Sequence, residues 1–488
     1  MNSITRRSFI HKAAAASTGV FYIAKTSWAE KSPGDTINMA VIGFHGRGGS
    51  HISGYKGLSK EGVRIGALCD VDSEVLEKGL SGLGKGGKGK DKIKPQGYTD
   101  MRKLFEDKSI DAVSIATPNH WHALASIWAM QAGKDVYVEK PVSHNIWEGR
   151  QMVKAARHLN RIVQTGTQSR SSREGIFEAV KWVQAGNLGK IKLARGLCYK
   201  RRPSIGKTEG PQHVPDSIDF DLWCGPAPKD DLRRAKLHYD WHWQWNYGNG
   251  DLGNQGIHQM DIARWFLGEM TLSPRVWSAG GRMGYDDDGQ TANTQIVYHD
   301  YEKAPLIFEV RGLPDSAKGK NMDKLKGASV GVIVECENGY VVVPNYTGAT
   351  AYDNNGAEIK TWKGSEDHFK NFINACRSRN KDDLNADILE GHLSSGLCHM
   401  ANISYRLGHE ESPEGIKEKI KADKYAEESF GRMAEHLGKN DVDITKDKVT
   451  LGPSLKFDAE AERFIDDDKA NALVKDKYRA PFVVPEEV

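Results

Sequence analysis

The stretch Ile37-Asn-Met-Ala-Val-Ile42-Gly43-Phe-His-Gly46-Arg-Gly48 decides the fold of this chain. Its first six residues are an apolar run typical of a buried strand, the glycines form a turn, and a helix is predicted over residues 49–58. A second apolar run, residues 63–68, is followed by Asp70. Strand, glycine turn, helix, strand and acidic residue, in this order, predict a dinucleotide-binding unit with the Rossmann fold.

The glycine turn indicates how a dinucleotide would be held. A pyrophosphate binds backbone N–H groups at a helix N-terminus where no side chains stand in the way. We therefore expect contacts from Gly43, Gly46, Arg47 and Gly48. His45 stands where the usual G-x-G-x-x-G pattern has glycine, so a glycine-rich turn in another α/β fold is the alternative interpretation.

The acidic residue after the second strand predicts which dinucleotide binds. A carboxylate at Asp70 can bind both hydroxyls of a ribose and repels a 2′-phosphate, so NAD is favoured over NADP, a preference that Arg47 would soften. Further cofactor contacts are expected where two later strands end, at Thr117, Asn119, His120, Glu139 and Lys140. For His120, a loop histidine without a chemical role is an equally open interpretation.

The order of apolar runs predicts two domains. Strands at 111–116, 135–139 and 162–163 alternate with helices at 122–131 and 147–159, which predicts a doubly wound parallel sheet over residues 35–165. Alternating stretches follow in residues 166–410 and predict an α/β domain with an open, mostly antiparallel sheet. These stretches are 190–199, 276–282, 294–298, 306–310, 331–335 and 340–343, with a helix expected at 386–407. Residues 411–488 are expected to form a charged C-terminal extension.

The first 29 residues read as an export signal. Thr5-Arg6-Arg7-Ser8-Phe9-Ile10 precedes a short Ala-rich stretch and then Ser27-Trp28-Ala29, a small-x-small cleavage pattern. The paired arginines resemble the twin-arginine signal, which carries folded proteins. We expect export to the periplasm with the cofactor already bound, and no stable membrane span, because the apolar stretch is short.

Composition excludes several classes of function. The chain has 488 residues, of which 39% are hydrophobic and 27% charged, with a net charge of +3. This charge is too small to argue for nucleic acid or anionic lipid as a partner. The six cysteines are scattered, so isolated buried thiols are expected and no metal site is predicted. The Gly/Lys-rich residues 81–92 are expected to form a surface loop.

Glu139-Lys140-Pro141 is the strongest sign of catalysis. It directly follows an apolar run that is typical of a buried parallel strand. A buried lysine is unfavourable unless its ammonium has a partner or a role, and this one is expected beside the nicotinamide. We therefore predict that Lys140 carries a proton during oxidation of an alcohol or reduction of a ketone.

A second polar segment, residues 248–261, is expected to complete the site. Asn254, His258 and Asp261 are spaced i, i+4 and i+7 and share one face if a helix begins near Asn254. A histidine opposite Lys140 can exchange a proton with a substrate hydroxyl, so His258 is the second predicted catalytic residue. Asn254 and Asp261 are predicted substrate contacts, although polar capping of a helix also explains Asp251 or Asn254.

The segment Trp241-His-Trp243-Gln-Trp245-Asn-Tyr247 is dense in aromatic residues. Aromatic faces pack against the C–H faces of sugars, which makes Trp243 a candidate substrate contact. A half-buried strand with core tryptophans is the equally open alternative. Four arginines at positions 170, 173, 201 and 202 can bind an acidic sugar, but a solvated surface is the preferred interpretation.

These motifs together resemble the Gfo/Idh/MocA family of oxidoreductases over about residues 37–407. The resemblance implies a Rossmann domain followed by an open sheet with a substrate site on one face and a subunit interface on the other, hence a homo-oligomer. It implies NAD(P)-dependent chemistry on sugars and cyclitols, with Lys140 handling the substrate proton and His258 as the matching histidine. The position four residues before this histidine is commonly aspartate in the family, and here it is Asn254, which cannot act as a base.

Three functions are consistent with this pattern. The first is an exported NAD-dependent oxidoreductase acting on a ring hydroxyl or ketone of a sugar, cyclitol or glycoside. The second is an NAD-dependent glycosidase, as in an exported branch that the chain resembles, working by transient oxidation and elimination with a tightly held cofactor. The third is a sugar-binding protein that has lost catalysis, for which Asn254 is the only support. The intact Lys140 favours the first.

Overall fold

The computed structural model describes residues 36–84 and 94–488. The predicted twin-arginine signal and its cleavage site, and most of the Gly/Lys-rich loop, lie outside the described residues. In the part of the chain that is described, no helix is both long and apolar enough to cross a membrane. All six cysteines lie within it, and each is buried and free, as expected.

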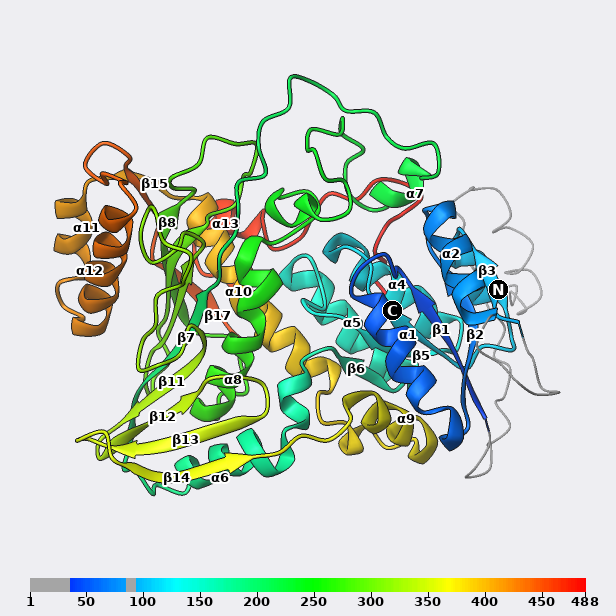
Figure 1. Ribbon diagram of the computed structural model, residues 1–488, viewed down its shortest axis with the longest axis horizontal. Helices are drawn as coiled ribbons and strands as arrows, with labels where there is room; N and C mark the ends of the chain where they lie inside the picture. Colours follow the sequence, from blue (N-terminus) through cyan, green and yellow to red (C-terminus); the bar gives the residue numbers. More distant parts are fainter. Residues whose placement is uncertain (1–35, 85–93) are drawn as a thin grey trace, which may run out of the picture. The chain divides into compact units, whose positions relative to one another are not determined.

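The first domain is the predicted Rossmann sheet (Figure 1). Six strands, all parallel, lie in the order β3 (Gln96–Tyr98), β2 (Val63–Cys69), β1 (Ile37–Ile42), β4 (Ala112–Ile115), β5 (Asp135–Val138) and β6 (Val163–Thr165). The helices are α1 (Gly48–Gly57), α2 (Ser73–Gly84), α3 (Met101–Glu106), α4 (Asn119–Gln131) and α5 (Ile146–His158). Because the strands are parallel, their carboxyl ends share one edge, and the residues after β1, β4 and β5 meet there.

Helix α4 begins earlier than the sequence pattern predicts. The helix was expected from residue 122, but it starts at Asn119 directly after Pro118. Proline fits the N-terminal end of a helix because it has no N–H that needs a partner. The polar residues Asn119 and His120 therefore belong to the first turn of the helix and are not part of a loop.

The second domain is a mixed, mostly antiparallel sheet, which confirms the predicted fold class. Its strands run in the order β14 (Glu358–Lys363), β13 (Gly348–Asp353), β12 (Gly339–Val343), β11 (Val330–Cys336), β7 (Ile191–Tyr199), β10 (Leu306–Arg311), β9 (Thr294–His299), β8 (Arg275–Gly281), β16 (Val449–Leu451) and β15 (His409–Glu411). Along this path β7 and β10 are parallel and every other neighbouring pair is antiparallel. β17 (Leu455–Asp458) pairs with β8 and with β18 (Arg463–Phe464).

One face of this sheet packs on helices that border the site. α8 (Ile257–Leu267) and α10 (Ile388–Arg406) contribute Phe266, Leu397 and Met400 to the largest apolar cluster, together with inward residues of β7 and β10. The remaining helices are α6 (Glu178–Gln184), α7 (Phe220–Cys224), α9 (His368–Ser378) and α13 (Asp468–Asn471).

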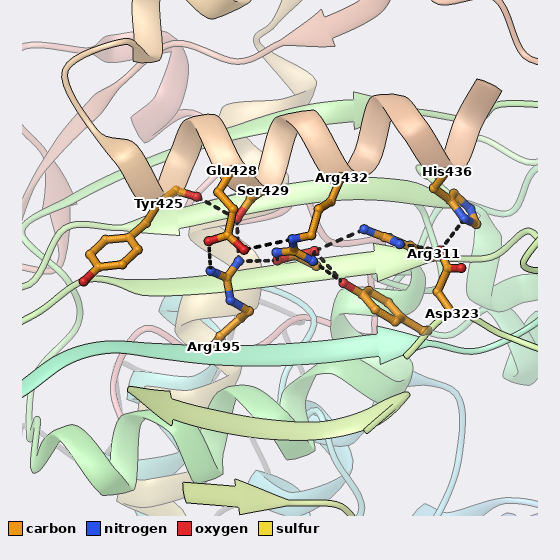
Figure 2. Close-up of polar contacts among 10 residues, drawn as sticks. Arg195, Arg311, Asp323, Tyr425, Glu428, Ser429, Arg432 and His436 are labelled. Atoms are coloured by element: carbon orange, nitrogen blue, oxygen red, sulfur yellow. Dashed lines mark hydrogen bonds and ion pairs between the residues drawn. The ribbon is translucent and has the colours of Figure 1, made fainter. Parts of the chain in front are cut away.

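The opposite face is covered by α11 (Pro413–Ile420) and α12 (Lys424–Lys439), drawn in orange-brown in Figure 1. Figure 2 shows the polar contacts beneath α12. The fully buried Arg195 of β7 binds Glu309 of β10 at 2.5 Å and Ser429 of α12 at 2.6 Å, and Arg432 of α12 binds Glu309 at 3.0 Å. Phe430 and Met433 pack on the sheet beside this cluster.

Residues 411–488 do not form a separate charged extension. They supply β16, β17, β18 and the cover helices, and their last residues return to the first domain, where Phe482 lies 5.5 Å from the ring of Trp121. The high charge of this segment masked its pattern, because the two cover helices bury only one face and expose charged residues on the other.

A long segment between β7 and α8 reaches across the carboxyl edge of the Rossmann sheet. Ser73 N–H donates to the carbonyl oxygen of Ser217 at 2.9 Å, and the indole N–H of Trp121 donates to that of Leu222 at 3.0 Å. The segment has its own apolar cluster around Trp223 and Tyr247. It therefore forms a wall over the edge where ligands bind.

Candidate active site

A cavity of about 630 Å³ lies along the carboxyl edge of the Rossmann sheet. Its walls come from the glycine turn after β1, the ends of β2, β4 and β5, the long segment after β7, and the turn that leads into α8. Residues from both domains therefore line one cavity, as the sequence predicts for Lys140 and His258.

The glycine turn is shaped by two close backbone approaches. Gly43 has φ +73°, and a Cβ there would lie 2.9 Å from backbone atoms of Thr117. A Cβ on Gly48 would lie 2.2 Å from the carbonyl oxygen of Gly43. Gly43, Gly46 and Arg47 line the cavity, whereas Gly48 is absent from its described lining and is needed for packing inside the turn. The expected cofactor contact of Gly48 is thus corrected to a structural role.

Asp70, just after β2, is hydrogen-bonded to the turn that follows β1. Asp70 lines the cavity and accepts hydrogen bonds from the N–H groups of Phe44 at 2.9 Å and Asp72 at 3.1 Å. Burial raises the pKa of Asp70, and the two backbone donors oppose this change. His45, the departure from the glycine pattern, stacks on His238 with ring centroids 4.0 Å apart. The histidine thus connects the glycine turn to the long segment that covers it.

Some of the residues after β4 line the cavity, and others are buried in the core. Thr117 and Asn119 line the cavity, and Oγ1 of Thr117 is buried without a hydrogen-bond partner among the described residues. His120 does not line it. Its ring nitrogens lie 3.0 Å from the carbonyl oxygen of Trp223 and 3.4 Å from that of Tyr247, and burial lowers its pKa to about 3. The structure does not bring His120 to the cavity, because helix α4 turns this side chain toward the long segment, and this placement fits the alternative of a histidine without a chemical role.

Glu139 is held as a carboxylate at the end of β5. Oε1 accepts from Nε of Arg47 at 2.8 Å and Nε2 of His51 lies 3.1 Å away, while Gln168 donates at 3.3 Å. Burial by itself would raise the pKa of Glu139, but the hydrogen bond from His51 and the charge of Arg47 outweigh it and keep the pKa well below its usual range. Glu139 therefore fixes Arg47 and cannot supply a proton near neutral pH.

Lys140 lies in the cavity with its ammonium bound by the second domain. Its Nζ donates to the carbonyl oxygen of Asn254 at 2.5 Å. Burial lowers the pKa of Lys140, the charge of Glu139 opposes this, and the charges of Arg47 and Lys200 add to the lowering. A lysine with a lowered pKa loses its proton more readily, which suits a group that accepts a proton from a hydroxyl.

His258 and Asn254 both line the cavity with unpartnered buried nitrogen atoms. Nδ1 of His258 and Nδ2 of Asn254 have no hydrogen-bond partner within the described residues. Burial, and then the charge of Lys140, lowers the pKa of His258 well below its usual value, so the imidazole is neutral. Such orphaned groups are unfavourable unless a ligand satisfies them.

Asp261 and Trp243, predicted as substrate contacts, are placed elsewhere. Asp261 is fully buried and bound by Arg170 at 2.8 and 2.9 Å, and it is absent from the described cavity lining. Trp243 is also buried outside that lining, next to Arg202, in a short 3-10 helix where a strand was the alternative expectation. Asp261 lies about one turn beyond His258 in the regular helix α8, where Arg170 and Ser394 bind it in the core, so the shared face does not extend into the cavity.

Two of the four arginines assigned to a solvated surface are buried ion-pair partners. Arg170 binds Asp261 as above, and Arg202 binds Asp251 with Nη2 2.6 Å from Oδ1. Arg173 lies over the ring of Phe177, and Arg201 is exposed. Arginine is often buried when a carboxylate pairs with its fork, and sequence spacing does not reveal such long-range partners.

Several cavity residues were not predicted. They are Gln168, Lys200, Tyr239, His242, Gln255 and Tyr346. The ring of Tyr346 lies 4.9 Å from that of His258, and its hydroxyl accepts from Gln255 at 2.6 Å. Tyr346 stands in the turn between β12 and β13, where a single tyrosine carries no sequence signal of its own.

The residues present fit a bound dinucleotide. The glycine turn lies at the N-terminus of α1, and the carboxylate of Asp70 lies just after β2. The unpartnered Oγ1 of Thr117 lies between this turn and the end of β5, where Lys140 stands. Along the edge, Asp70 after β2, the glycine turn after β1 and the ends of β4 and β5 follow one another in the sheet, an order that matches ribose, pyrophosphate and nicotinamide.

Comparison with known proteins agrees with this geometry. Residues 37–167 match the family described as "Oxidoreductase family, NAD-binding Rossmann fold", and residues 181–436 match "Oxidoreductase family, C-terminal alpha/beta domain", both of the Gfo/Idh/MocA group. The chain belongs to the Gfo/Idh/MocA oxidoreductases. Its first domain is therefore an NAD-binding domain, as predicted from the glycine turn and Asp70.

Two curated proteins are similar to this chain over part of their length. A glycosyl hydrolase family 109 protein of Solibacter usitatus is 33% identical over 160 residues, which are 30% of this chain and 36% of the relative. An alpha-N-acetylgalactosaminidase of Tannerella forsythia is 28% identical over 216 residues, 40% of this chain and 44% of the relative. The chain thus spans less than half the length of these two curated relatives.

A solved structure shows the same fold. The WlbA dehydrogenase from Bordetella pertussis, in complex with NADH and UDP-GlcNAcA, superposes with a TM-score of 0.54 at 19% identity. The match covers 74% of this chain and 94% of that one. At this identity the likeness concerns the fold alone.

Proposed function

We propose that this Gfo/Idh/MocA protein is an NAD-dependent oxidoreductase that oxidises a ring hydroxyl of a sugar, cyclitol or glycoside to a ketone, or reduces the ketone. The observation that carries the proposal is the position of Lys140 at the end of β5, in the same cavity as the neutral His258 of the second domain. The family assignment and the carbohydrate-related names of its relatives support it.

The two residues have separable roles. In the oxidising direction, the neutral amine of Lys140 accepts the proton of the substrate hydroxyl, and the negative charge that develops on oxygen is stabilised by the resulting ammonium. The unpartnered nitrogen of His258 orients that hydroxyl by a hydrogen bond. When bound, NAD accepts the hydride from the substrate carbon. The carbonyl oxygen of Asn254 holds Nζ of Lys140 in position.

The experiment loads the purified protein with NAD and follows absorbance at the NADH band on mixing with a panel of sugars, cyclitols and methyl glycosides. We expect some of these compounds to reduce the bound NAD. In His258→Ala and Lys140→Met this reduction should be lost, although NAD stays bound. Protein that neither carries nor binds NAD contradicts the proposal. Protein that binds NAD and sugars without any reduction corresponds instead to the sugar-binding protein that has lost catalysis.

Cleavage of a glycoside is the second candidate function. It is favoured by the glycosyl hydrolase names of partial relatives. In this reaction transient oxidation is followed by elimination and re-reduction, so the cofactor shows no net change. The test is glycoside hydrolysis in D₂O, with deuterium expected next to the oxidised carbon of the product. Cleaved product without deuterium at that carbon rules out this route.

Export by the twin-arginine route to the periplasm, with a tightly held NAD, belongs to the same proposal. Arg6-Arg7 and the Ala29 cleavage pattern support it, and the long segment over the cavity edge would slow release of a bound dinucleotide. Fractionation of cells that express the protein and its Arg6→Lys, Arg7→Lys variant tests the route. Wild-type protein retained in the cytoplasm contradicts it.

Self-association through the second sheet remains a prediction from the family resemblance. Helices α11 and α12 occupy the outer face of β7, β9 and β10, so a second copy would have to dock on those helices or on the strands from β11 to β14. Light scattering over a range of protein concentrations measures the mass. A monomer at every concentration contradicts the expected homo-oligomer.

A further inference from the structure

Three aromatic rings form a row in the wall of the cavity. Trp241, His242 and Tyr239 all line it, and each comes from the short 3-10 helix or the residue before it. The ring centroids of Trp241 and His242 are 3.7 Å apart with planes 19° from parallel, and those of His242 and Tyr239 are 4.7 Å apart. Exposure rises along the row, from 8% at Trp241 to 47% at Tyr239. The row thus runs from the cavity interior toward solvent.

Tyr239 is an exposed aromatic residue, and packing does not explain its exposure. The large hydrophobic side chains that are exposed among the described residues are Tyr239, Met270, Ile359, Ile465 and Val483. Of these, Tyr239 is the one in the described lining of the cavity. An aromatic side chain that is accessible from a cavity is placed to contact a bound ligand.

The row is held rigidly. Nη1 of Arg202 donates to the hydroxyl of Tyr239 at 3.2 Å, and the same guanidinium is fixed by Asp251, with Nε 2.9 Å from Oδ2. Nδ1 of His242 lies 2.5 Å from the carbonyl oxygen of Tyr239, which sets the angle of the imidazole. A surface that is ordered before binding loses little entropy when a ligand arrives.

The row belongs to the substrate end of the cavity. Burial, together with the charges of Lys140 and Arg202, lowers the pKa of His242 to about 3, so the ring is neutral and lies within the electrostatic reach of the proposed catalytic lysine. His238, which stacks on His45, lies instead toward Asp72 at 3.3 Å and the ribose side. The aromatic row and the ribose side are therefore distinct parts of the wall.

Flat neutral rings suit the C–H face of a pyranose, whose hydroxyls then point sideways to polar groups. Arg202 and Lys200 stand at this end as donors, and Lys200 already donates to Gln255 at 3.0 Å. Cations can also stack on aromatic faces, but Lys140 and Lys200 in the same cavity repel a cation, whereas a neutral sugar ring packs on these faces through its C–H groups.

We propose that Tyr239 and His242 form an outer subsite that holds a second sugar ring, so that the substrate is a glycoside or oligosaccharide and not a free monosaccharide. The ring that reacts lies at Lys140 and His258, and the attached ring lies on the aromatic row toward solvent. This inference rests on the proposed oxidoreductase function and adds the substrate class.

The test compares disaccharides with their component monosaccharides in NAD-loaded protein, using cellobiose, lactose and trehalose against glucose and galactose. Tyr239→Ala is expected to raise KM for the preferred disaccharide about ten-fold, with kcat within about two-fold, because it removes one stacking contact. KM for the monosaccharide is expected to stay within about two-fold of wild type. Tyr239→Phe, which keeps the ring, is expected to restore most of the disaccharide affinity.

Two controls separate the outcomes. Met270→Ala, an exposed apolar residue in the turn after α8, should change neither KM. Calorimetry measures sugar binding to the NAD-loaded protein without turnover. If a disaccharide binds in a Tyr239-dependent way but NAD is not reduced, the subsite is supported and the proposed oxidation is contradicted. The proposed subsite is contradicted if Tyr239→Ala weakens the binding of disaccharide and monosaccharide equally. It is also contradicted if this variant binds NAD more weakly.

Discussion

The ammonium of Lys140 donates a 2.5 Å hydrogen bond to the carbonyl oxygen of Asn254, a residue 114 positions later in the chain. The first residue lies just after β5 of the Rossmann domain, and the second lies in the π-helical turn that leads into α8 and His258. The contact explains how a site with asparagine in place of the common aspartate can keep its lysine in place. The backbone of residue 254 positions Lys140, and its side chain is not needed for this purpose.

Removing the amine of Lys140 should abolish hydride transfer and leave the cofactor bound. In Lys140→Met we expect the rate of NAD reduction to fall roughly 10² to 10⁴-fold, because a positioned acid–base group contributes about that factor. The glycine turn and Asp70 are untouched, so the NAD content of purified protein should not change. Lys200→Met removes the other lysine of the cavity and should cost less than about ten-fold. Turnover of Lys140→Met within ten-fold of wild type excludes its proposed role.

The two glycines at 46 and 48 should respond differently to a methyl group. In Gly48→Ala the new Cβ would lie 2.2 Å from the carbonyl oxygen of Gly43, so the turn must shift and the cofactor-free protein should lose about 1–3 kcal/mol of unfolding free energy. Around Gly46 nothing lies within 4 Å, so Gly46→Ala should keep its stability and weaken NAD binding by crowding the pyrophosphate. Urea denaturation and NAD titration measure the two effects. Equal stability of both variants would show that the turn is adaptable.

Glu148, in the first turn of α5, should make stability fall as pH rises. Burial, and then the charge of Asp476, raises the pKa of this carboxyl to about 7 in the folded protein, above its unfolded value. Its contribution to stability is therefore fully present below pH about 4.5 and is lost as the pH rises through about 7. At pH 8 Glu148→Gln should be more stable than wild type by up to about 3 kcal/mol, and at pH 4 the advantage should vanish.

The neutral glutamine can still accept the 2.7 Å hydrogen bond from the N–H of His144. Glu302→Gln, at an exposed position, serves as the matched control and should change the unfolding free energy by less than about 0.5 kcal/mol at either pH. Thermal or urea unfolding at the two pH values provides the measurement. A Glu148→Gln variant that is equally destabilised at pH 4 and pH 8 contradicts the buried-acid explanation.

The cluster under α12 should depend most on Glu309, its buried carboxylate, and less on the half-exposed Glu428. Glu309 is 1% exposed, and Arg195 and Arg432 both bind it, so their charges outweigh burial and lower its pKa to about 2. Glu309→Gln leaves the buried Arg195 and the half-buried Arg432 with only the half-exposed carboxylate of Glu428 and should cost about 3–5 kcal/mol of unfolding free energy. Hydrogen exchange should show faster opening of α12 before the Rossmann sheet.

Glu435 is the control for that experiment because it lies on the same helix in an exposed i,i+4 pair with Lys439. Glu435→Gln should cost less than about 0.5 kcal/mol. If Glu309→Gln costs as little as this control, the arginines find other partners and the cluster does not hold α12 on the sheet.

Local patterns explain what could be predicted. The order from Ile37 to Asp70 is a short-range signal, because strand, turn and helix form between neighbouring residues, and the structure confirms the Rossmann sheet. Lys140 was placed correctly in the cavity for the same reason, since the end of a parallel strand is a defined location. The prediction around His258 was only partly right, because Asp261 lies one turn further along α8, where Arg170 and Ser394 bind it in the core.

By itself, the sequence determined the fold of the first domain, the dinucleotide edge and the position of Lys140, because each depends on residues close together in the chain. Only the tertiary structure decided the partners: Asn254 for Lys140, Asp261 for Arg170, Glu309 for Arg195, and Tyr346 and Tyr239 for the cavity wall. Burial and long-range pairing set those contacts, and the free energy of a buried charge depends on a partner that lies far away in the chain.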